Sequence, residues 1–177
     1  MKTRFVFILV ACLAAVQPAW CGHALNPQQQ RILQKWLGQH RVFRIATDAD
    51  CQCNKAIEDM KADSGADRKE LEDFHPYVVT GDFKHDGVED FAVAVIDGSK
   101  KTDNFVVLVF DGPFAQTPQN SPVRPFVASG LNLKGEALFY GPPESKPYRL
   151  MIGRFESDYV TLIVPKGDSY RLEASDE

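Results

Sequence analysis

The chain has 177 residues, of which 44% are hydrophobic, and its formal net charge is −4 at pH 7. That length suits one ordinary domain with a hydrophobic core. An acidic chain without a basic stripe is a poor partner for nucleic acid or an anionic membrane, so we expect neither as a partner.

The N-terminal segment has the layout of a secretory signal peptide. Lys2 and Arg4 precede an apolar run over residues 5–16, and the small residues Gly22 and Ala24 stand at the two positions that a signal peptidase reads. The run is too short to be a retained membrane span, and no later segment is long and apolar enough to form one. We therefore expect an exported protein, periplasmic or extracellular.

Processing of this signal has three alternatives. Cleavage after Ala24 is preferred, cleavage after Cys21 is the second choice, and lipoprotein processing at Cys12 is the third. The preferred cleavage leaves residues 25–177 as the mature domain. It takes the count of Lys and Arg from 20 to 18 against 24 acidic residues, so the net charge becomes −6.

The first part of the mature chain has helical patterns. Asn26 is a good capping residue, Pro27 suits the first helical turn, and apolar residues including Trp36 then recur at helical spacing. Asp50 is the expected cap of a second helix. The helices expected are 27–38, 50–61 and 68–74, with a short strand at 41–46.

From Tyr77 onward the pattern changes to short strands. Segments 91–96 and 105–110 are apolar at nearly every position, which is typical of central strands covered on both faces. Helices followed by strands predict a single α+β domain, in which the N-terminal helices pack on a mainly antiparallel meander. Further strands are expected at 77–80, 126–129, 136–140, 148–154, 159–164 and 169–172.

The segment GDFKHDGVEDFAVAV, residues 81–95, has the spacing of a calcium loop. Asp82, Asp86 and Asp90 occupy its first, fifth and ninth positions, and Gly87 occupies the sixth. Calcium takes six to eight oxygen ligands, so its loops carry acids at alternate positions and a glycine at the sharp turn. These aspartates are the strongest candidate ligands in the chain.

The pattern Gly-Asp-Phe-x-x-Asp-Gly-x-x-Asp-Phe-Ala-Val-Ala resembles the FG-GAP-type repeats of integrin-like and bacterial extracellular proteins. The resemblance implies that Asp82, Asp86, Asp90 and the carbonyl of Val88 are calcium ligands. Those repeats have Asn or Asp at the third position, where this chain has Lys84. A lysine there removes an oxygen and places a positive charge near the ion. Two interpretations stay open: a structural calcium ion, or a metal-free loop in which the Lys84 ammonium lies among the carboxylates and replaces the ion.

A wider set of short motifs covers most of the mature chain. It comprises Cys-x-Cys-Asn, Phe-His-Pro-Tyr, the loop above, Asp-Asn-Phe and Tyr-Gly-Pro-Pro followed by Lys-Pro-Tyr-Arg-Leu. Together these motifs resemble a group of small uncharacterised bacterial secreted proteins. The resemblance carries no activity with it.

Two cysteines remain after signal cleavage, Cys51 and Cys53. In an oxidising compartment they pair with each other or stay as thiols. A disulfide between them closes a very small ring and therefore constrains little of the unfolded chain.

Five aromatic residues are the best candidates for a partner surface. They surround a Gly-Pro-Pro turn, and they either form a platform for a protein or glycan or fill the second side of the sheet. These residues are Phe139, Tyr140, Tyr148, Phe155 and Tyr159.

The chain lacks a nucleophile motif, a phosphate-binding loop and a dinucleotide fingerprint. We therefore favour an exported, non-enzymatic binding protein of unknown ligand. The alternatives are an envelope hydrolase with an unidentified acid pair, or an inhibitor or immunity protein of an envelope enzyme.

Overall fold

A computed structural model of the chain describes residues 25–63, 74–114, 122, 124–141, 149–155 and 160–175. The expected signal peptide and most of the helical turn expected at 68–74 lie outside these residues, as do Tyr148 and Tyr159.

The described helices are α1 (Pro27–Gln39), α2 (Asp48–Cys51) and α3 (Asn54–Asp63). The Asn26 side chain caps α1 by accepting from the backbone N–H groups of Gln28 and Gln29, and the Gln29 side chain accepts from the Asn26 N–H. No helix in the described part of the chain has both the length and the apolar character needed to cross a membrane.

The single helix predicted over 50–61 is wrong, because the structure has two helices there. Gln52 adopts a left-handed conformation with φ of 58° and separates α2 from α3. Thr47, and not Asp50, stands at the cap position of α2, and the Asp50 carboxylate accepts from the Thr47 N–H. Cys51 and Cys53 lie on either side of this break and form a disulfide.

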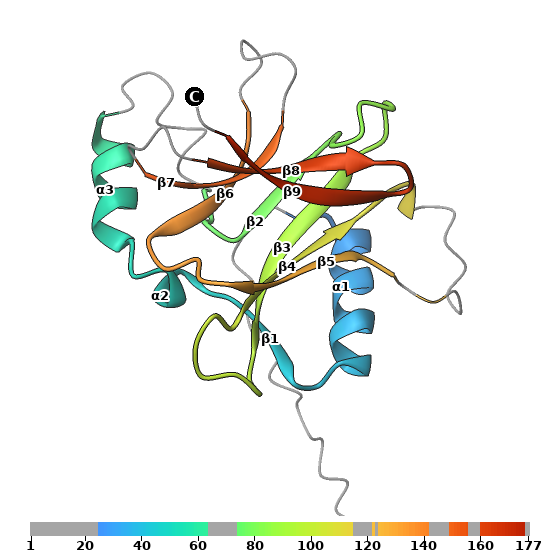
Figure 1. Cartoon of the computed structure of the whole chain (residues 1–177), viewed down its shortest axis with the longest axis horizontal. Coiled ribbons are helices and arrows are strands. Elements are labelled where there is room, and N and C mark those ends of the chain that lie inside the picture. The colour runs from blue at the N-terminus through green and yellow to red at the C-terminus, as the bar shows by residue number, and fades with distance from the viewer. Residues whose placement is uncertain are drawn as a thin grey trace, which may run out of the picture.

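The strands form two antiparallel sheets, which together with the helices confirm the α+β class (Figure 1). The first sheet contains β1 (Phe43–Ile45), β2 (Val78–Gly81), β3 (Asp90–Asp97), β4 (Phe105–Phe110) and β5 (Phe126–Leu131). The second is a meander of β6 (Glu136–Tyr140), β7 (Leu150–Arg154), β8 (Val160–Lys166) and β9 (Ser169–Ser175). The prediction of one sheet is thus corrected to two.

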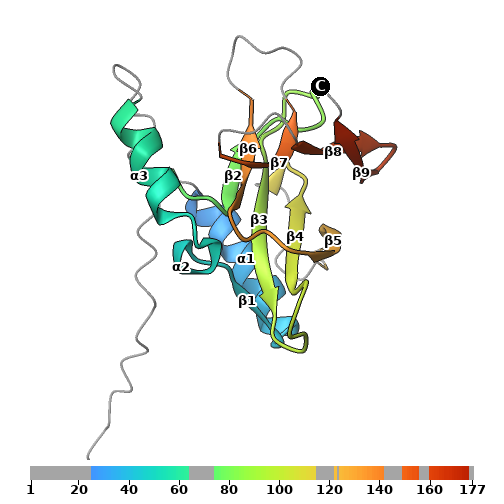
Figure 2. The same ribbon diagram turned by 60° about the vertical axis from the view of Figure 1, so that its left-hand side comes forward.

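The division into two sheets follows from the apolar character of β3 and β4. Their residues alternate between two buried clusters, so both faces of this strand pair need a cover. On one face, Phe91 and Val93 share a cluster with Leu33 and Trp36 of α1. The other face packs against the second sheet, with buried contributions from Ala92, Ala94, Leu138, Leu150 and Ile163. Figures 1 and 2 show α1 and the β6–β9 meander on different sides of the central strands.

Candidate functional site

The Asp loop, residues 82–90, connects β2 to β3 and is closed by its own hydrogen bonds. Asp82 Oδ1 accepts from the Asp86 N–H at 3.0 Å, and Asp82 Oδ2 accepts from the Gly87 N–H at 2.8 Å. Asp86 Oδ1 accepts from the Val88 N–H at 2.9 Å. Gly87 has φ of 82°, a conformation that glycine adopts without strain. The loop is therefore a tight turn whose first aspartate bonds its own backbone.

Asp90 connects this loop to the end of β4. Its side chain is buried, with 2% of the residue exposed, and its two oxygens accept from the N–H groups of Phe83 at 3.0 Å and Gly112 at 2.9 Å. Burial raises the pKa of Asp90 to about 6, and the negative charge of Asp111 acts in the same direction, while the two N–H donors oppose the rise. The carboxyl thus holds two separate segments together from inside the protein.

Lys84 bonds outside the loop. Its Nζ lies 2.6 Å from Asp111 Oδ2, and the other oxygen of Asp111 accepts from the Tyr170 hydroxyl at 2.6 Å. The Lys84 ammonium also lies 5.4 Å from the centroid of the Tyr170 ring. Burial and the hydrogen bond to Asp111 raise the pKa of Tyr170. We call Lys84, Asp90, Asp111 and Tyr170 the clamp, because they join the loop, the end of β4 and β9.

The clamp differs from the arrangement expected for Lys84. That interpretation placed the ammonium among the carboxylates of the loop, whereas the structure pairs it with Asp111, 27 residues away in the sequence. Asp111 and Tyr170 were not predicted, because their pairing spans 59 residues and leaves no local pattern.

The candidate calcium ligands do not converge in this arrangement. Across the ranges that the structure describes, no group of three or more His, Cys, Asp or Glu residues is placed to hold a metal ion. Both oxygens of Asp82 and of Asp90 already accept from backbone N–H groups. A calcium site with Asp82, Asp86, Val88 and Asp90 stays a prediction.

Two glycines permit the close approaches around the clamp. A Cβ on Gly112 would lie 2.6 Å from the backbone oxygen of Glu89, and a Cβ on Gly81 would lie 2.5 Å from the Tyr140 ring. The Tyr140 hydroxyl donates to the Asp82 carbonyl at 2.6 Å. Only residues without a side chain allow the β4 end and the Tyr140 ring to reach the loop this closely.

The aromatic residues proposed as a partner surface separate into two groups. Phe139 and Phe155 contact each other and Phe74, with ring centroids 5.7 to 6.0 Å apart, and all three are partly buried. We call these three residues the aromatic trio. Tyr140 instead packs against Phe83 beside the Asp loop. Phe74 was not predicted, and its sequence neighbourhood has no pattern that links it to the late strands.

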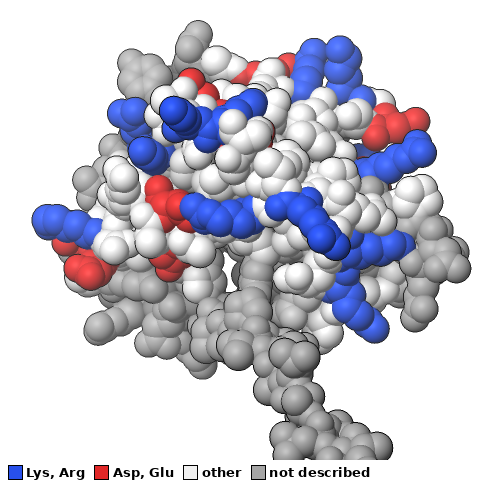
Figure 3. Space-filling view, turned by 90° about the horizontal axis from the view of Figure 1, so that it is seen from below, with Lys and Arg blue, Asp and Glu red and all other residues white. Residues whose placement is uncertain are grey.

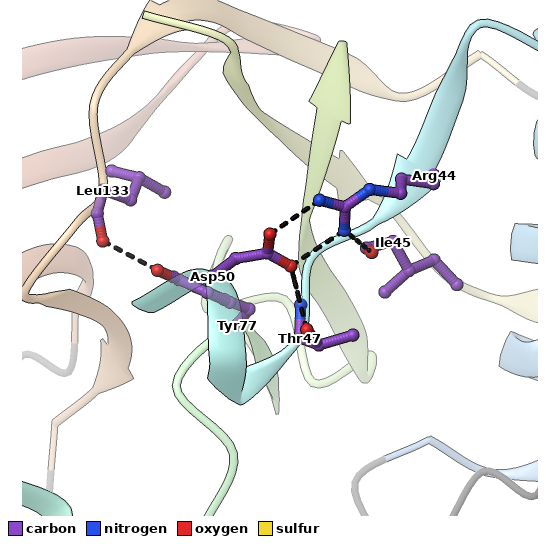
Figure 4. Close-up of polar contacts among 6 residues, drawn as sticks. All are labelled: Arg44, Ile45, Thr47, Asp50, Tyr77 and Leu133. Carbon is purple, nitrogen blue, oxygen red and sulfur yellow. Dashed lines mark hydrogen bonds and ion pairs between the residues drawn. The ribbon is translucent and has the colours of Figure 1, made fainter. Parts of the chain in front are cut away.

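A second polar network lies near the start of α2 (Figure 4). Arg44 of β1 donates to both carboxylate oxygens of Asp50, at 2.6 and 2.8 Å, and this bond holds the pKa of Asp50 well below its ordinary value. The buried Tyr77 donates to the Leu133 carbonyl at 2.8 Å, and its burial raises its pKa. The first contact connects β1 to α2, and the second connects the segment before β2 to the β5–β6 turn. We interpret them as structural bonds that hold these segments in place.

The Cys51–Cys53 disulfide lies beside this network. Both cysteines are buried, and the Cys51 carbonyl accepts from the Gly135 N–H at 2.7 Å. This backbone bond therefore holds the α2–α3 break, with its buried disulfide, against the β5–β6 turn.

Basic side chains gather at the end of the molecule opposite the Asp loop. Figure 3 shows Lys and Arg spread over this face, which carries β1 and the β3–β4 turn. Arg41, Arg44, Lys100 and Lys101 are exposed there, and Arg44 is paired with Asp50.

Comparisons with known proteins give no relative: no family model, no curated protein and no solved structure matches the chain.

Proposed function

We propose that the protein is an exported, non-enzymatic binding protein, folded as one domain, whose partner surface is built around the aromatic trio. The observation that supports this proposal is the trio itself. Its rings come from three separate segments, contact one another and remain partly exposed. Grouped aromatic side chains of this kind offer a large apolar area at small entropic cost, which suits a protein or glycan partner.

The bonding of the clamp supports a structural role for the acidic groups. Asp90 accepts two backbone N–H bonds, and Asp111 is engaged by Lys84 and Tyr170. Carboxylates held in this way position backbone segments, whereas a general acid or base needs access to a substrate. We assign the clamp to the stability of the loop end and not to chemistry.

Calcium titration distinguishes the two interpretations of the Asp loop. We propose that the loop is metal-free, so the protein should show no heat and no change in melting temperature at about 5 mM calcium, above the dissociation constants of extracellular calcium modules. Replacing Lys84 by Asn supplies the missing oxygen and should then create a site. A calcium-dependent rise in the melting temperature of the unaltered protein would establish the structural calcium ion instead.

The binding proposal is tested with the trio itself. The processed protein, immobilised and exposed to envelope extract from its source organism, should retain a partner that subsequently binds in calorimetry with saturation and fixed stoichiometry. Phe139→Leu combined with Phe155→Leu keeps apolar volume but removes the rings, and should weaken this binding about tenfold or more. Val127→Ala, an exposed position on β5, is the matched control and should bind normally.

Two results would contradict the proposal. One is equal binding by the Leu variant and the control, because the trio would then lie outside the interface. The other is turnover of envelope glycan or peptide by the purified protein, which would favour the hydrolase alternative. Thermal melting of each variant separates lost binding from lost folding.

A further inference from the structure

Within the described part of the chain, strand β9 has one edge that no other strand occupies. It is the last strand of the second sheet and pairs with β8 along its whole length, from Lys166–Ser169 at the turn to Val160–Ser175. Within the described residues, no strand pairs with its other edge and no further backbone hydrogen bond reaches it. In Figure 2 β9 lies at the outer margin of the molecule. Unpaired strand edges are templates for another strand.

The hairpin geometry identifies which backbone groups point outward. Lys166 and Ser169 flank a two-residue turn and form its closing hydrogen-bonded pair. Bonded and non-bonded pairs alternate in an antiparallel ladder, so Pro165 and Tyr170 form a non-bonded pair, in agreement with the missing N–H of proline. Two residues further on, the N–H and C=O of Leu172 likewise point away from β8. Leu172 is thus the middle outward-facing position of β9.

The side chains around this position are suited to a second copy of the same strand. Leu172 is 40% exposed, one of the few large apolar side chains so exposed among the described residues. Arg171 and Glu173 flank it on the opposite face of the strand and form an ion pair with each other. Tyr170 points inward and meets Phe126 of β5, so β5 lies under the inner face of β9.

We propose that two copies of the chain pair antiparallel through β9, with Leu172 against Leu172 at the two-fold axis. In this register Arg171 of each copy stands opposite Glu173 of the other, in two equivalent non-bonded pairs where side chains are closest. Centring the pairing on Arg171 or on Glu173 instead sets like charges against each other. The charge pattern therefore selects one register, and the contact is self-complementary, as a two-fold dimer requires.

This dimer goes beyond the proposed binding function and leaves its surface open. The second sheet has the order β6-β7-β8-β9, so Phe139 on β6 lies at the far edge from β9. Each dimer then carries two copies of the aromatic trio, each beside an outer edge of one continuous sheet. Two linked copies bind a repetitive partner with higher avidity than one.

A charge exchange tests the register. Sedimentation velocity of the full chain, expressed with its own N-terminal segment and collected as processed, should show a monomer–dimer equilibrium over about a hundredfold range of concentration. Arg171→Glu or Glu173→Arg alone turns both cross-strand attractions into repulsions and should weaken dimerisation about tenfold or more. The two single variants mixed together should form a heterodimer, and the double exchange should restore self-association.

A proline tests the edge itself. Leu172→Pro removes an N–H that does not bond to β8, so the β8–β9 hairpin should persist while the hydrogen bonds between the two copies are lost. Leu172→Ala keeps this N–H. It is the control and should weaken the dimer less. If thermal melting shows that Leu172→Pro is unfolded, the dimer proposal is judged on the charge-exchange variants alone. A chain that stays monomeric at its highest soluble concentration overturns the proposal. So does a dimer that neither the proline nor the charge reversals disturb.

Discussion

Replacing Asp90 by asparagine should change how the stability of the protein depends on pH. The carboxyl is buried, accepts from the N–H groups of Phe83 and Gly112, and has a pKa raised from 3.8 to about 6. Between these values the folded chain holds a proton that the unfolded chain has released. The free energy of unfolding therefore decreases as the pH rises through this interval.

The size of this pH effect follows from the difference between the folded and unfolded pKa values of Asp90. At about 1.4 kcal/mol per pH unit, the full effect is roughly 3 kcal/mol, of which about 2 kcal/mol lies between pH 4.5 and pH 7.5. Asparagine does not titrate, so the difference in unfolding free energy, wild type minus Asp90→Asn, should increase by this amount as the pH falls from 7.5 to 4.5. The amide also places an NH₂ group opposite a backbone donor, which destabilises the variant at every pH by about 1–3 kcal/mol.

Urea unfolding at pH 4.5, 5.5, 6.5 and 7.5 measures this difference. Asp168→Asn, at an exposed position in the β8–β9 turn, is the matched control for the exchange of a carboxylate for an amide. NMR titration of the Asp90 carboxyl carbon in the unaltered protein reads the same pKa directly and does not need the variant to fold. Two results would refute the reasoning. One is a difference in unfolding free energy, wild type minus Asp90→Asn, that is constant to within about 0.5 kcal/mol over this pH range. The other is an Asp90 carboxyl that titrates near 4.

Three further substitutions test other parts of the structure. Tyr77→Phe leaves a buried carbonyl without its donor and should lower the unfolding free energy by about 1–2 kcal/mol in urea; a loss below about 0.5 kcal/mol would contradict the bond. Gly112→Ala places a Cβ against the backbone of the Asp loop and should reduce the melting temperature strongly, whereas Gly38→Ala, with open space around it, should not; equal effects would refute the close approach. Asp50→Asn removes the ion pair with Arg44 and should lower stability by about 1 kcal/mol at pH 7. Because the pKa of Asp50 is depressed in the folded chain, the difference in unfolding free energy between wild type and Asp50→Asn should shrink as the pH falls below 4. This trend has the opposite sign to that of Asp90. Chemical denaturation across pH 3–7 checks it.

Local patterns determined much of the secondary structure. The capping Asn26 and the following Pro27 located the start of α1, and the apolar segments located β3 and β4 to within one residue at each end. These signals depend on a few neighbouring residues, which the sequence displays directly. The break at Gln52 was missed, because glutamine has no preference for the left-handed conformation that it adopts there.

The candidate site was also predictable only where its contacts are local in the sequence. The loop spacing predicted that Asp82, Asp86 and Asp90 lie in one tight turn, and the hydrogen bonds within residues 82–90 form such a turn. The separation of Tyr140 from Phe139 was not predictable, because neighbouring residues of a strand point to opposite faces and only the packing of those faces gives each its partners.

The sequence by itself therefore determined which segments are strands, and that β3 and β4 need cover on both faces. It did not determine that the cover is a second sheet, nor that Lys84 meets Asp111 and Tyr170. The contact across 27 positions depends on the pairing of β3 with β4, which brings the loop beside Asp111. The contact across 59 positions exists because the second sheet places the start of β9 over the end of β4. Tertiary packing decides such pairs, since the free energy that selects them belongs to the stacked sheets and not to any short stretch of chain.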